Sequence, residues 1–323
     1  MALRPEDITI AITVFSRRQF VHAAIRSALE QTVPVRVIIV ENCSPDKQFR
    51  DFVLAEFGGQ VGYFQNTHNR GMFDNWNACM EYARTPWLSI LHDDDLLRPN
   101  FVETMLAFTR DVPGRALYYG RGANLTEVDQ KIYPPEPVAW PGGWRDLDVL
   151  ELAEYCFLMF PGQLFQIAAA RELGGFRKAS YFTGDWDMWF RLAVAHGAAQ
   201  IATEVAVNRS HYGLDRGTSR VERMGWKWAL DNAQRKRNLR LLRQARGLDI
   251  PFDRVKLLAT QPVSSRVLLR FAPAFSRRIL AYNTWLFTHS RPPNRAYAAL
   301  QWLARLFGPG VFRLLARGFP QKV

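Results

Sequence analysis

The hydrophobic pattern of the first hundred residues alternates between short apolar runs and longer amphipathic segments. Ile8–Val14 is a continuous apolar and β-branched run, which is typical of a strand buried on both faces. Residues 18–31 then place apolar side chains at helical spacing. The same alternation predicts further strands at 35–40, 61–64 and 87–91, helices at 45–57 and 72–83, and a helix with Pro99 in its first turn. Strands separated by helices of this length predict βαβ units, and therefore an α/β fold with a mostly parallel sheet covered by helices on both faces.

The pattern beyond Tyr119 is less regular. A proline- and glycine-rich stretch at 133–144 predicts a loop that serves as a lid. After it, the spacing of apolar residues predicts a helix at 146–157, a strand at 163–167, a short helix at 168–173, a helix at 184–195 and a strand at 201–207. Beyond Ser219 the sequence is helical and basic. We therefore predict two domains, an α/β domain over 1–220 and a helical basic extension over 221–323.

The charge distribution separates the same two regions. The 323-residue chain has a formal net charge of +12. Its first 224 residues hold 27 acidic and 23 basic residues, whereas residues 225–323 hold 3 acidic and 19 basic ones. Two interpretations of this basic region stay open: helices lying in an anionic membrane interface, or an extension that packs on the core with a solvated basic rim. We expect no nucleic-acid partner, because the sequence has no recognised nucleic-acid-binding module.

Cysteine spacing and hydropathy bear on the compartment. Cys43, Cys79 and Cys156 have no C-x-x-C spacing, which argues against a zinc site or a disulfide framework and fits a reducing compartment. The N-terminus lacks the apolar core of a signal peptide, and the sequence has no apolar stretch of transmembrane length. We expect a cytoplasmic location, either free or peripheral on the inner face of the membrane.

The acidic triplet Asp93-Asp94-Asp95 directly follows the predicted strand at 87–91. Neighbouring carboxylates repel one another, so a cation or a hydrogen-bonding partner is needed to offset their charge. Mg²⁺ and Mn²⁺ prefer oxygen ligands and commonly use one or two carboxylates together with phosphate and water. The triplet therefore indicates a divalent metal ion that holds a diphosphate, with a solvated acidic turn as the alternative.

Polar side chains also follow the other predicted strands. These groups lie at 13–17, 41–44 and 66–71, and ligands of open parallel sheets bind outside the carboxyl ends of the strands. Glu41 and Asn42 offer acceptors for a base or ribose, and Arg70 offers a cation for phosphate.

Two further candidates lie far along the chain. Asp185 begins an apolar helix beside aromatic residues, where it is either a helix N-cap or a functional carboxylate. His211 follows a predicted strand, where it is either a metal or phosphate ligand or an ordinary hydrogen-bonded polar residue.

Taken in order, these motifs give residues 8–219 a resemblance to a known family. The chain resembles the inverting GT-A glycosyltransferases of family 2. The resemblance is carried by Thr13-Val14-Phe15-Ser16-Arg17, Ile39-Val40-Glu41-Asn42-Cys43-Ser44, Asn69-Arg70-Gly71, Leu91-His92-Asp93-Asp94-Asp95-Leu96-Leu97-Arg98-Pro99, Gly174-Gly175-Phe176, Gly184-Asp185-Trp186-Asp187 and Arg209-Ser210-His211.

The resemblance implies a role for each matching residue. It implies a GT-A, Rossmann-like domain with Mg²⁺ or Mn²⁺ as cofactor and Asp185 as the catalytic base. Two residues depart from the family pattern: Asn42 replaces the second acid after the second strand, and Gly184 replaces the acid before Asp185. The other implied roles are donor binding by Thr13, Phe15, Arg17, Glu41, Asn42, Arg70 and Asp93, metal binding by Asp94 and His211, and support by Asp95, Trp186, Asp187 and Arg216.

The implied activity is a metal-dependent, inverting hexosyl or deoxyhexosyl transfer. Its donor would be a nucleotide-diphosphate sugar and its acceptor a saccharide or lipid-linked saccharide, in the synthesis of a cell-surface polysaccharide. A nucleotidyltransferase is an alternative, but that class calls for a glycine-rich phosphate loop after the first strand, and residues 13–17 contain no glycine. The departure at Gly184 leaves a non-catalytic sugar-nucleotide-binding module open as well.

Overall fold

The structure of the protein is a computed structural model that describes residues 3–126, 129–210 and 227–246. The chain divides into two units, Met1–Gly213 and Leu214–Val323. The first unit contains the sheet, and the described part of the second is the helix α9 (Lys227–Arg246). None of the helices in the described ranges combines the length and hydrophobicity that a membrane span requires.

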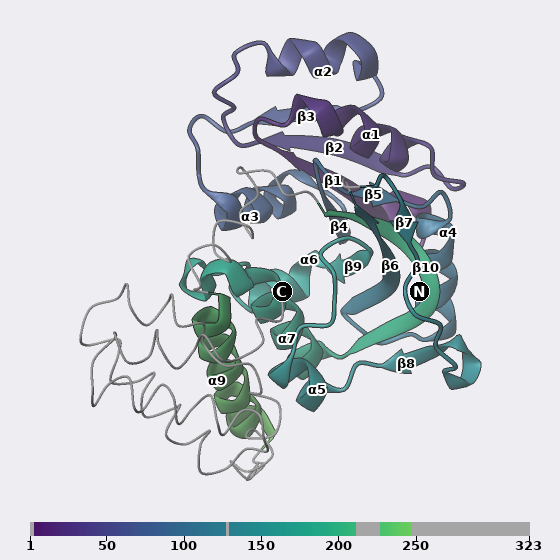
Figure 1. Ribbon diagram of the computed structural model, residues 1–323, viewed down its shortest axis with the longest axis vertical. Helices are drawn as coiled ribbons and strands as arrows, with labels where there is room; N and C mark the ends of the chain where they lie inside the picture. Colours follow the sequence, from purple (N-terminus) through teal and green to yellow (C-terminus); the bar gives the residue numbers. More distant parts are fainter. Residues whose placement is uncertain (1–2, 127–128, 211–226, 247–323) are drawn as a thin grey trace, which may run out of the picture. The chain divides into compact units, whose positions relative to one another are not determined.

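The first unit is built on a mixed sheet in the order β3-β2-β1-β4-β9-β6-β10-β5, with β7 paired to β6 and β8 to β10 (Figure 1). Strands β3, β2, β1 and β4 run parallel, as do β6 and β10, while β9 lies antiparallel between β4 and β6. The prediction of an α/β fold with a mostly parallel sheet is confirmed. The strands are β1 (Ile8–Val14), β2 (Arg36–Glu41), β3 (Gly62–Gln65), β4 (Trp87–His92), β5 (Leu96–Leu97), β6 (Leu117–Thr126), β7 (Ile132–Tyr133), β8 (Trp144–Asp146), β9 (Gln163–Gln166) and β10 (Ala198–Ser210).

Helices cover both faces of this sheet because side chains of the buried strands alternate between them. Ile10 and Ile12 of β1 join one core with α1, α2 and α4, whereas α3, α6 and α7 pack on the other face. Figure 1 shows α1 and α3 on opposite sides of β1. The helices are α1 (Arg18–Leu29), α2 (Phe49–Phe57), α3 (Met72–Tyr82), α4 (Phe101–Asp111), α5 (Val149–Glu154), α6 (Ile167–Glu172) and α7 (Gly184–His196), with 3-10 turns η1 (Pro5–Asp7), η2 (Pro141–Gly143) and η3 (Lys178–Thr183).

Three predicted helix boundaries are wrong, and in each case a residue near the boundary makes a hydrogen bond outside the helix ladder. The helix predicted from 45 begins at Phe49, because Asp46 accepts a hydrogen bond from the Gln48 amide and so forms a turn before it. Pro99 precedes α4 instead of lying in its first turn, and its carbonyl accepts from the Thr32 amide. The helix predicted at 146–157 is only α5, because Asp148 caps the Leu150 and Glu151 amides.

The segment predicted as a lid, 133–144, runs from the end of β7 through η2 to the start of β8. Most of its residues are exposed. The Trp140 ring attaches this segment to Arg145, whose guanidinium lies 4.8 Å from the ring. The same guanidinium lies 5.0 Å from the Phe157 ring. The lid role itself stays a prediction.

The junction between β4 and β9 determines how the chain reaches the acidic triplet. Backbone pairing of these strands covers only Trp87 with Gln166 and Leu88 with Phe165. Beyond that point the fully buried Gln163 side chain forms the hydrogen bonds to β4. Its Nε2 donates to the Ile90 carbonyl at 2.6 Å, and its Oε1 accepts from the Ile90 amide at 3.4 Å. A carboxamide thus replaces a peptide unit and keeps the buried backbone of Ile90 satisfied.

Candidate active site

The acidic triplet is buried where β4 ends, and hydrogen-bond donors from two distant elements compensate it. The Arg17 Nη1 donates to Asp93 Oδ1 at 3.0 Å and to Asp94 Oδ2 at 2.5 Å. Arg209, near the end of β10, donates its amide to Asp95 Oδ1 at 2.9 Å and its Nε to the Asp94 carbonyl at 2.9 Å. The turn therefore joins the ends of β1, β4 and β10.

Burial changes the protonation of two side chains in this turn. It raises the pKa of Asp93 to about 7, an effect that the Arg17 charge opposes and the Asp94 charge reinforces. Burial also lowers the pKa of His92 to about 4, so that the imidazole is neutral at physiological pH. The His92 ring stacks on Phe160, with 3.8 Å between ring centroids.

Three side chains of this turn fit a divalent metal ion. His92, Asp94 and Asp95 each offer one ligand atom, and these atoms lie within 4.8 Å of one another. Two carboxylates and a neutral imidazole form a donor set that suits Mn²⁺, and the carboxylates also suit Mg²⁺. Asp94 was predicted as a ligand, whereas His92 was not, although its position beside the acidic run was a signal for it. The predicted residues His211 and Arg216 lie outside the described residues.

The Glu41 carboxylate holds together the turn that follows β2. Its Oε1 accepts from the Ser44 amide at 2.8 Å and from Gln65 Nε2 at 2.9 Å, and its Oε2 accepts from the Tyr63 hydroxyl at 2.6 Å. Glu41 is almost completely buried. Its predicted contact with the nucleoside stays a prediction, and the structure adds a bracing role that the sequence did not indicate.

Asparagine side chains link this turn to the loop before α3. Asn42 Nδ2 donates to Asn69 Oδ1 at 3.0 Å and to the Gly71 carbonyl at 3.3 Å. Asn66 Nδ2 donates to Asn75 Oδ1 at 2.8 Å and to Asn42 Oδ1 at 3.4 Å. Gly71 is the N-cap of α3 with φ +79°, a conformation that favours glycine. We refer to Asn42, Asn66, Asn69 and Asn75 as the amide cluster.

The other predicted donor-binding residues lie at or near the same sheet edge. Thr13 is buried at the end of β1, beside His92 of β4. Phe15 lies just beyond and is 39% exposed. The Arg70 guanidinium forms a two-pronged ion pair with Glu81 of α3, with both N–O distances at 3.1 Å. A phosphate would therefore have to compete with Glu81 for this arginine.

Asp185 lies in the first turn of α7 and is half-buried between buried neighbours. Its Oδ1 accepts a hydrogen bond from the Trp186 amide at 2.8 Å, and the Trp186 indole donates to the Leu152 carbonyl. Burial, together with the nearby charges of Asp185 and Asp95 among others, raises the pKa of the Tyr119 hydroxyl well above its ordinary value. The charges of Asp185 and Asp95 thus both oppose ionisation of this buried phenol.

The structure explains why a glycine precedes Asp185. A Cβ atom at Gly184 would lie 2.0 Å from the Phe73 ring of α3. Carbon atoms in contact are normally about 3.5–4.0 Å apart, so a side chain here requires the ring to move. The Phe73 ring occupies the space of the acidic side chain that the family pattern places at this position.

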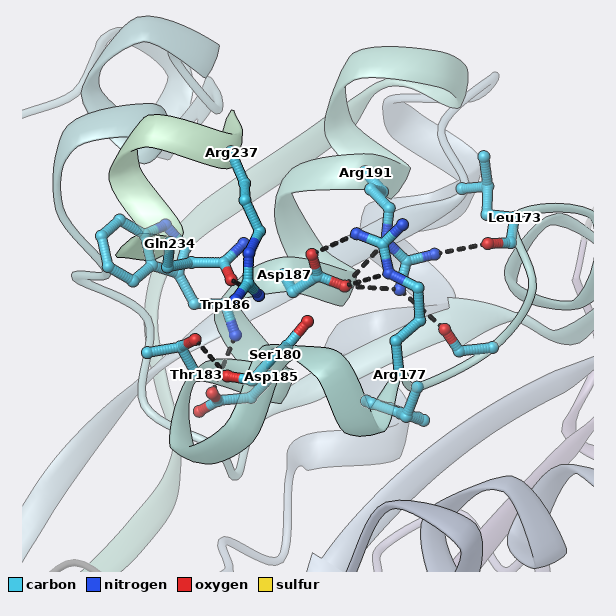
Figure 2. Close-up of polar contacts among 12 residues, drawn as sticks. Leu173, Arg177, Ser180, Thr183, Asp185, Trp186, Asp187, Arg191, Gln234 and Arg237 are labelled. Carbon is cyan, nitrogen blue, oxygen red and sulfur yellow. Dashed lines mark hydrogen bonds and ion pairs between the residues drawn. The ribbon is translucent and has the colours of Figure 1, made fainter. Parts of the chain in front are cut away.

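An ion-pair cluster around the fully buried Asp187 fixes the start of α7 (Figure 2). Asp187 Oδ2 accepts from Arg177 Nε at 3.0 Å and from Arg191 Nε at 2.9 Å. The Arg191 guanidinium also donates hydrogen bonds to the Leu173 and Gly175 carbonyls, both at 2.7 Å. Asp187 thereby connects α7 to the turn after α6, and Arg177 and Arg191 are structural residues that the sequence reasoning missed.

Comparison with known proteins gives one family and several relatives. The family model described as Glycosyl transferase family 2 matches residues 9–173. An uncharacterized glycosyltransferase of Rickettsia felis is 24% identical over 192 residues, covering 57% of this chain and 31% of that protein. The succinoglycan biosynthesis protein ExoO of Rhizobium meliloti is 32% identical over 101 residues, covering 31% of this chain and 29% of that protein. The chain thus spans about a third of the length of these two curated relatives.

Solved structures share the fold at low sequence identity. The S. aureus TarS 1–349 complex with UDP-GlcNAc has a TM-score of 0.58 at 10% identity and covers 98% of this chain and 93% of TarS 1–349. The mannosyltransferase PcManGT of Pyrobaculum calidifontis, in complex with GDP-Man and Mn²⁺, has a TM-score of 0.55 at 15% identity and covers 94% of this chain and 90% of that one. These similarities confirm the predicted GT-A fold.

The Asp187 cluster predicts an order of stabilities. Asp187→Asn leaves the buried Arg191 without its carboxylate, and Arg191→Gln leaves the fully buried Asp187 with only the partly exposed Arg177, so each should lower the free energy of unfolding by about 3–5 kcal/mol. Arg177→Gln should cost clearly less, because that side chain is 38% exposed whereas Arg191 is 6% exposed. Urea unfolding followed by tryptophan fluorescence measures all three. Equal losses for Arg177 and Arg191 would contradict this assignment of buried and solvent-screened partners.

The contact between Gly184 and Phe73 predicts a strong coupling between these positions. Gly184→Ala alone should lower the free energy of unfolding by about 1–3 kcal/mol, because the ring must move. In a Phe73→Ala background the same change should cost little, since the space is then open. A double-mutant cycle of unfolding free energies gives the coupling, and additive effects of the two changes would refute the steric explanation.

Proposed function

Because the chain belongs to glycosyl transferase family 2, we propose that this glycosyltransferase is a metal-dependent, inverting enzyme that uses a nucleotide-diphosphate sugar. The observation that carries this proposal is the buried Asp93–Asp94 pair at the end of β4, where Arg17 contacts both carboxylates and where His92 and Asp95 offer further metal ligands. A displacement at a sugar carbon requires such a donor site together with a base, for which we propose Asp185.

The donor would bind along the ends of β1, β2 and β4. Thr13, Phe15 and Asn42, which lie at or just beyond the ends of β1 and β2, would surround the nucleoside, and the Asp93 carboxylate would accept hydrogen bonds from ribose hydroxyls. Arg17 lies beside Asp93 and offers a cation to the diphosphate. The complexes of TarS with UDP-GlcNAc and of PcManGT with GDP-Man support a nucleotide-sugar donor.

Asp94 would hold the metal ion, with His92 or Asp95 beside it. When bound, a divalent ion stabilises as a Lewis acid the negative charge that builds on the departing diphosphate. His211 remains a proposed further ligand, supported by the hydrogen bond that holds the amide of Arg209 on Asp95, two residues earlier. The Mn²⁺ in the PcManGT complex supports a divalent metal.

Asp185 would act as the general base. Its carboxylate would take the proton of the acceptor hydroxyl while that oxygen bonds to the anomeric carbon, and the bond from that carbon to the diphosphate oxygen would break. A single displacement of this kind inverts the configuration at the anomeric carbon. The Asp187 cluster and the Trp186 indole hold the first turn of α7, and thus the backbone that carries Asp185.

The acceptor would be a saccharide or a lipid-linked saccharide, and the transferred group a hexosyl or deoxyhexosyl unit. The name of ExoO, a succinoglycan biosynthesis protein, supports a role in the synthesis of a cell-surface polysaccharide. The exposed segment 133–144 and Phe15 lie outside the core, where acceptor specificity is commonly built.

Substitution of the two carboxylates separates their proposed roles. Asp185→Asn should lower kcat by at least about 100-fold and leave nucleotide affinity nearly unchanged, because it removes only the base. Asp94→Asn should abolish the Mn²⁺-dependent part of nucleotide binding. Thermal-shift titrations with UDP- and GDP-sugars, with and without Mn²⁺, measure binding, and product analysis by mass spectrometry measures transfer.

Asp148→Asn is the matched control, since Asp148 also begins a helix and belongs to none of these motifs, and asparagine caps as well as aspartate. Normal turnover by Asp185→Asn would eliminate the base assignment. A nucleotidyl product would favour the nucleotidyltransferase alternative, and nucleotide-sugar binding without any product would favour the non-catalytic module.

We propose that residues 221–323 bring the enzyme to the cytoplasmic face of an anionic membrane, where a lipid-linked acceptor would lie. The observation behind this proposal is the excess of basic residues over 225–323, with 19 basic and 3 acidic residues. The helix α9 is the described part of this region. The full chain should float with vesicles containing phosphatidylglycerol and not with phosphatidylcholine vesicles, and high salt should release it. Sedimentation away from both kinds of vesicle would refute membrane attachment.

A further inference from the structure

The contacts of Arg17 have a consequence for the order in which ligands enter the site. One guanidinium nitrogen, Nη1, lies 3.0 Å from Asp93 Oδ1 and 2.5 Å from Asp94 Oδ2. The side chains of these two aspartates are only 8% and 11% exposed, and that of Arg17 is 21% exposed. The arginine therefore offsets, in a poorly hydrated place, part of the charge of the same carboxylate pair that the proposed function gives to ribose and metal.

A divalent cation and this guanidinium would compete for Asp94. Both are positive, and their repulsion is strong where water does not screen it. A metal ion on the Asp94 carboxylate therefore binds well only when Arg17 moves away from Oδ2, the oxygen that it contacts. Displacement alone is costly, because it moves a charged group away from two hydrogen-bond acceptors and offers nothing in return.

The backbone at Arg17 can stay fixed while its side chain moves. Arg17 is the N-cap of α1, and its carbonyl accepts hydrogen bonds from the Phe20 and Val21 amides, both at 3.3 Å. These bonds keep the residue at the junction of β1 and α1. The guanidinium is carried on a long stem with several rotatable bonds, and the side chain is 21% exposed, so we expect rotation about these bonds to release the carboxylates.

A nucleotide diphosphate supplies the group that can receive the displaced arginine. Guanidinium groups form charge-assisted, often two-pronged hydrogen bonds with phosphate. When nucleotide and metal enter together, Arg17 exchanges two carboxylates for phosphate oxygens, and the metal takes its place on Asp94. We propose that Arg17 is a resident counter-cation of Asp93 and Asp94 that couples metal binding to nucleotide binding, so that the site takes up a divalent ion poorly until a nucleotide diphosphate is present.

This inference rests on the proposed function, because it assumes a metal-dependent nucleotide site at Asp94. The release of Arg17 would make the binding of metal ion and nucleotide cooperative, so that each ligand improves the affinity of the other by the same factor. That factor should shrink when the arginine is removed.

The test is Mn²⁺ binding by the full chain, measured from the electron paramagnetic resonance signal of free Mn²⁺. Titrations are done without nucleotide and with saturating UDP or GDP. Arg17→Gln should bind Mn²⁺ alone at least about tenfold more tightly than the natural chain, and the improvement caused by nucleotide should fall by a similar factor. Arg17→Lys keeps the positive charge without the guanidinium fork, so its affinity for Mn²⁺ alone should lie between those of the natural chain and Arg17→Gln. This variant replaces Arg17→Gln in the test if Arg17→Gln folds poorly.

Arg18→Gln is the matched control. Arg18 is the next residue, and its guanidinium pairs with Asp46 instead of with the triplet, so this variant loses the same charge from the same helix start. Its affinity for Mn²⁺ alone should stay within about twofold of the natural chain, because solvent screens a partly exposed pair. Asp94→Asn should remove the tight binding gained in Arg17→Gln.

Two results would overturn the inference while leaving the proposed function intact. In the first, the natural chain binds Mn²⁺ with nucleotide, but Arg17→Gln binds Mn²⁺ alone no more tightly than the natural chain does. In the second, Arg18→Gln gains as much as Arg17→Gln, which would indicate a general charge effect. If the natural chain shows no Mn²⁺ binding even with UDP or GDP, the metal-dependent function fails first, and the inference falls with it.

Discussion

Three consecutive carboxylates can be buried at the end of a strand only if other parts of the chain bring compensating groups to them. In this protein, Arg17 reaches Asp93 and Asp94 from the start of α1, and Arg209 reaches Asp94 and Asp95 from the end of β10. The two arginines are far apart in sequence. The acidic turn therefore fixes how β1, β4 and β10 end relative to one another, and with them the edge of the sheet where the candidate site lies.

The sequence predicted the buried strands well because their signal is local. Ile8–Val14 is apolar throughout, and it forms β1 with the predicted boundaries. Boundaries set by side-chain hydrogen bonds were missed: Asp46 and Asp148 each form a turn or cap that shortens a predicted helix. The role of Gln163, whose carboxamide continues the pairing of β9 with β4, depends on a strand about seventy residues away and has no local signal.

For the candidate site, the sequence identified residue types but not their partners. Asp93, Asp94 and Asp185 follow from position and from family resemblance, and their predicted roles still await the tests given above. Three features of the site are tertiary contacts: Glu41 braces a turn, Glu81 pairs with Arg70, and Phe73 occupies the space beside Gly184. Each depends on which side chain from another element reaches the residue, and spacing along the chain does not encode this.

The amide cluster differs in kind from the charged turn beside it. Its hydrogen bonds join neutral carboxamides and backbone groups, and they hold Gly71 at the start of α3. Neutral hydrogen bonds do not titrate near neutral pH, whereas the buried Asp93 carboxyl, whose pKa burial raises to about 7, does. The amide cluster therefore keeps the same hydrogen bonds over the pH range in which the charge of the acidic turn changes, so the effect of acidity on ligand binding will report on the charged turn.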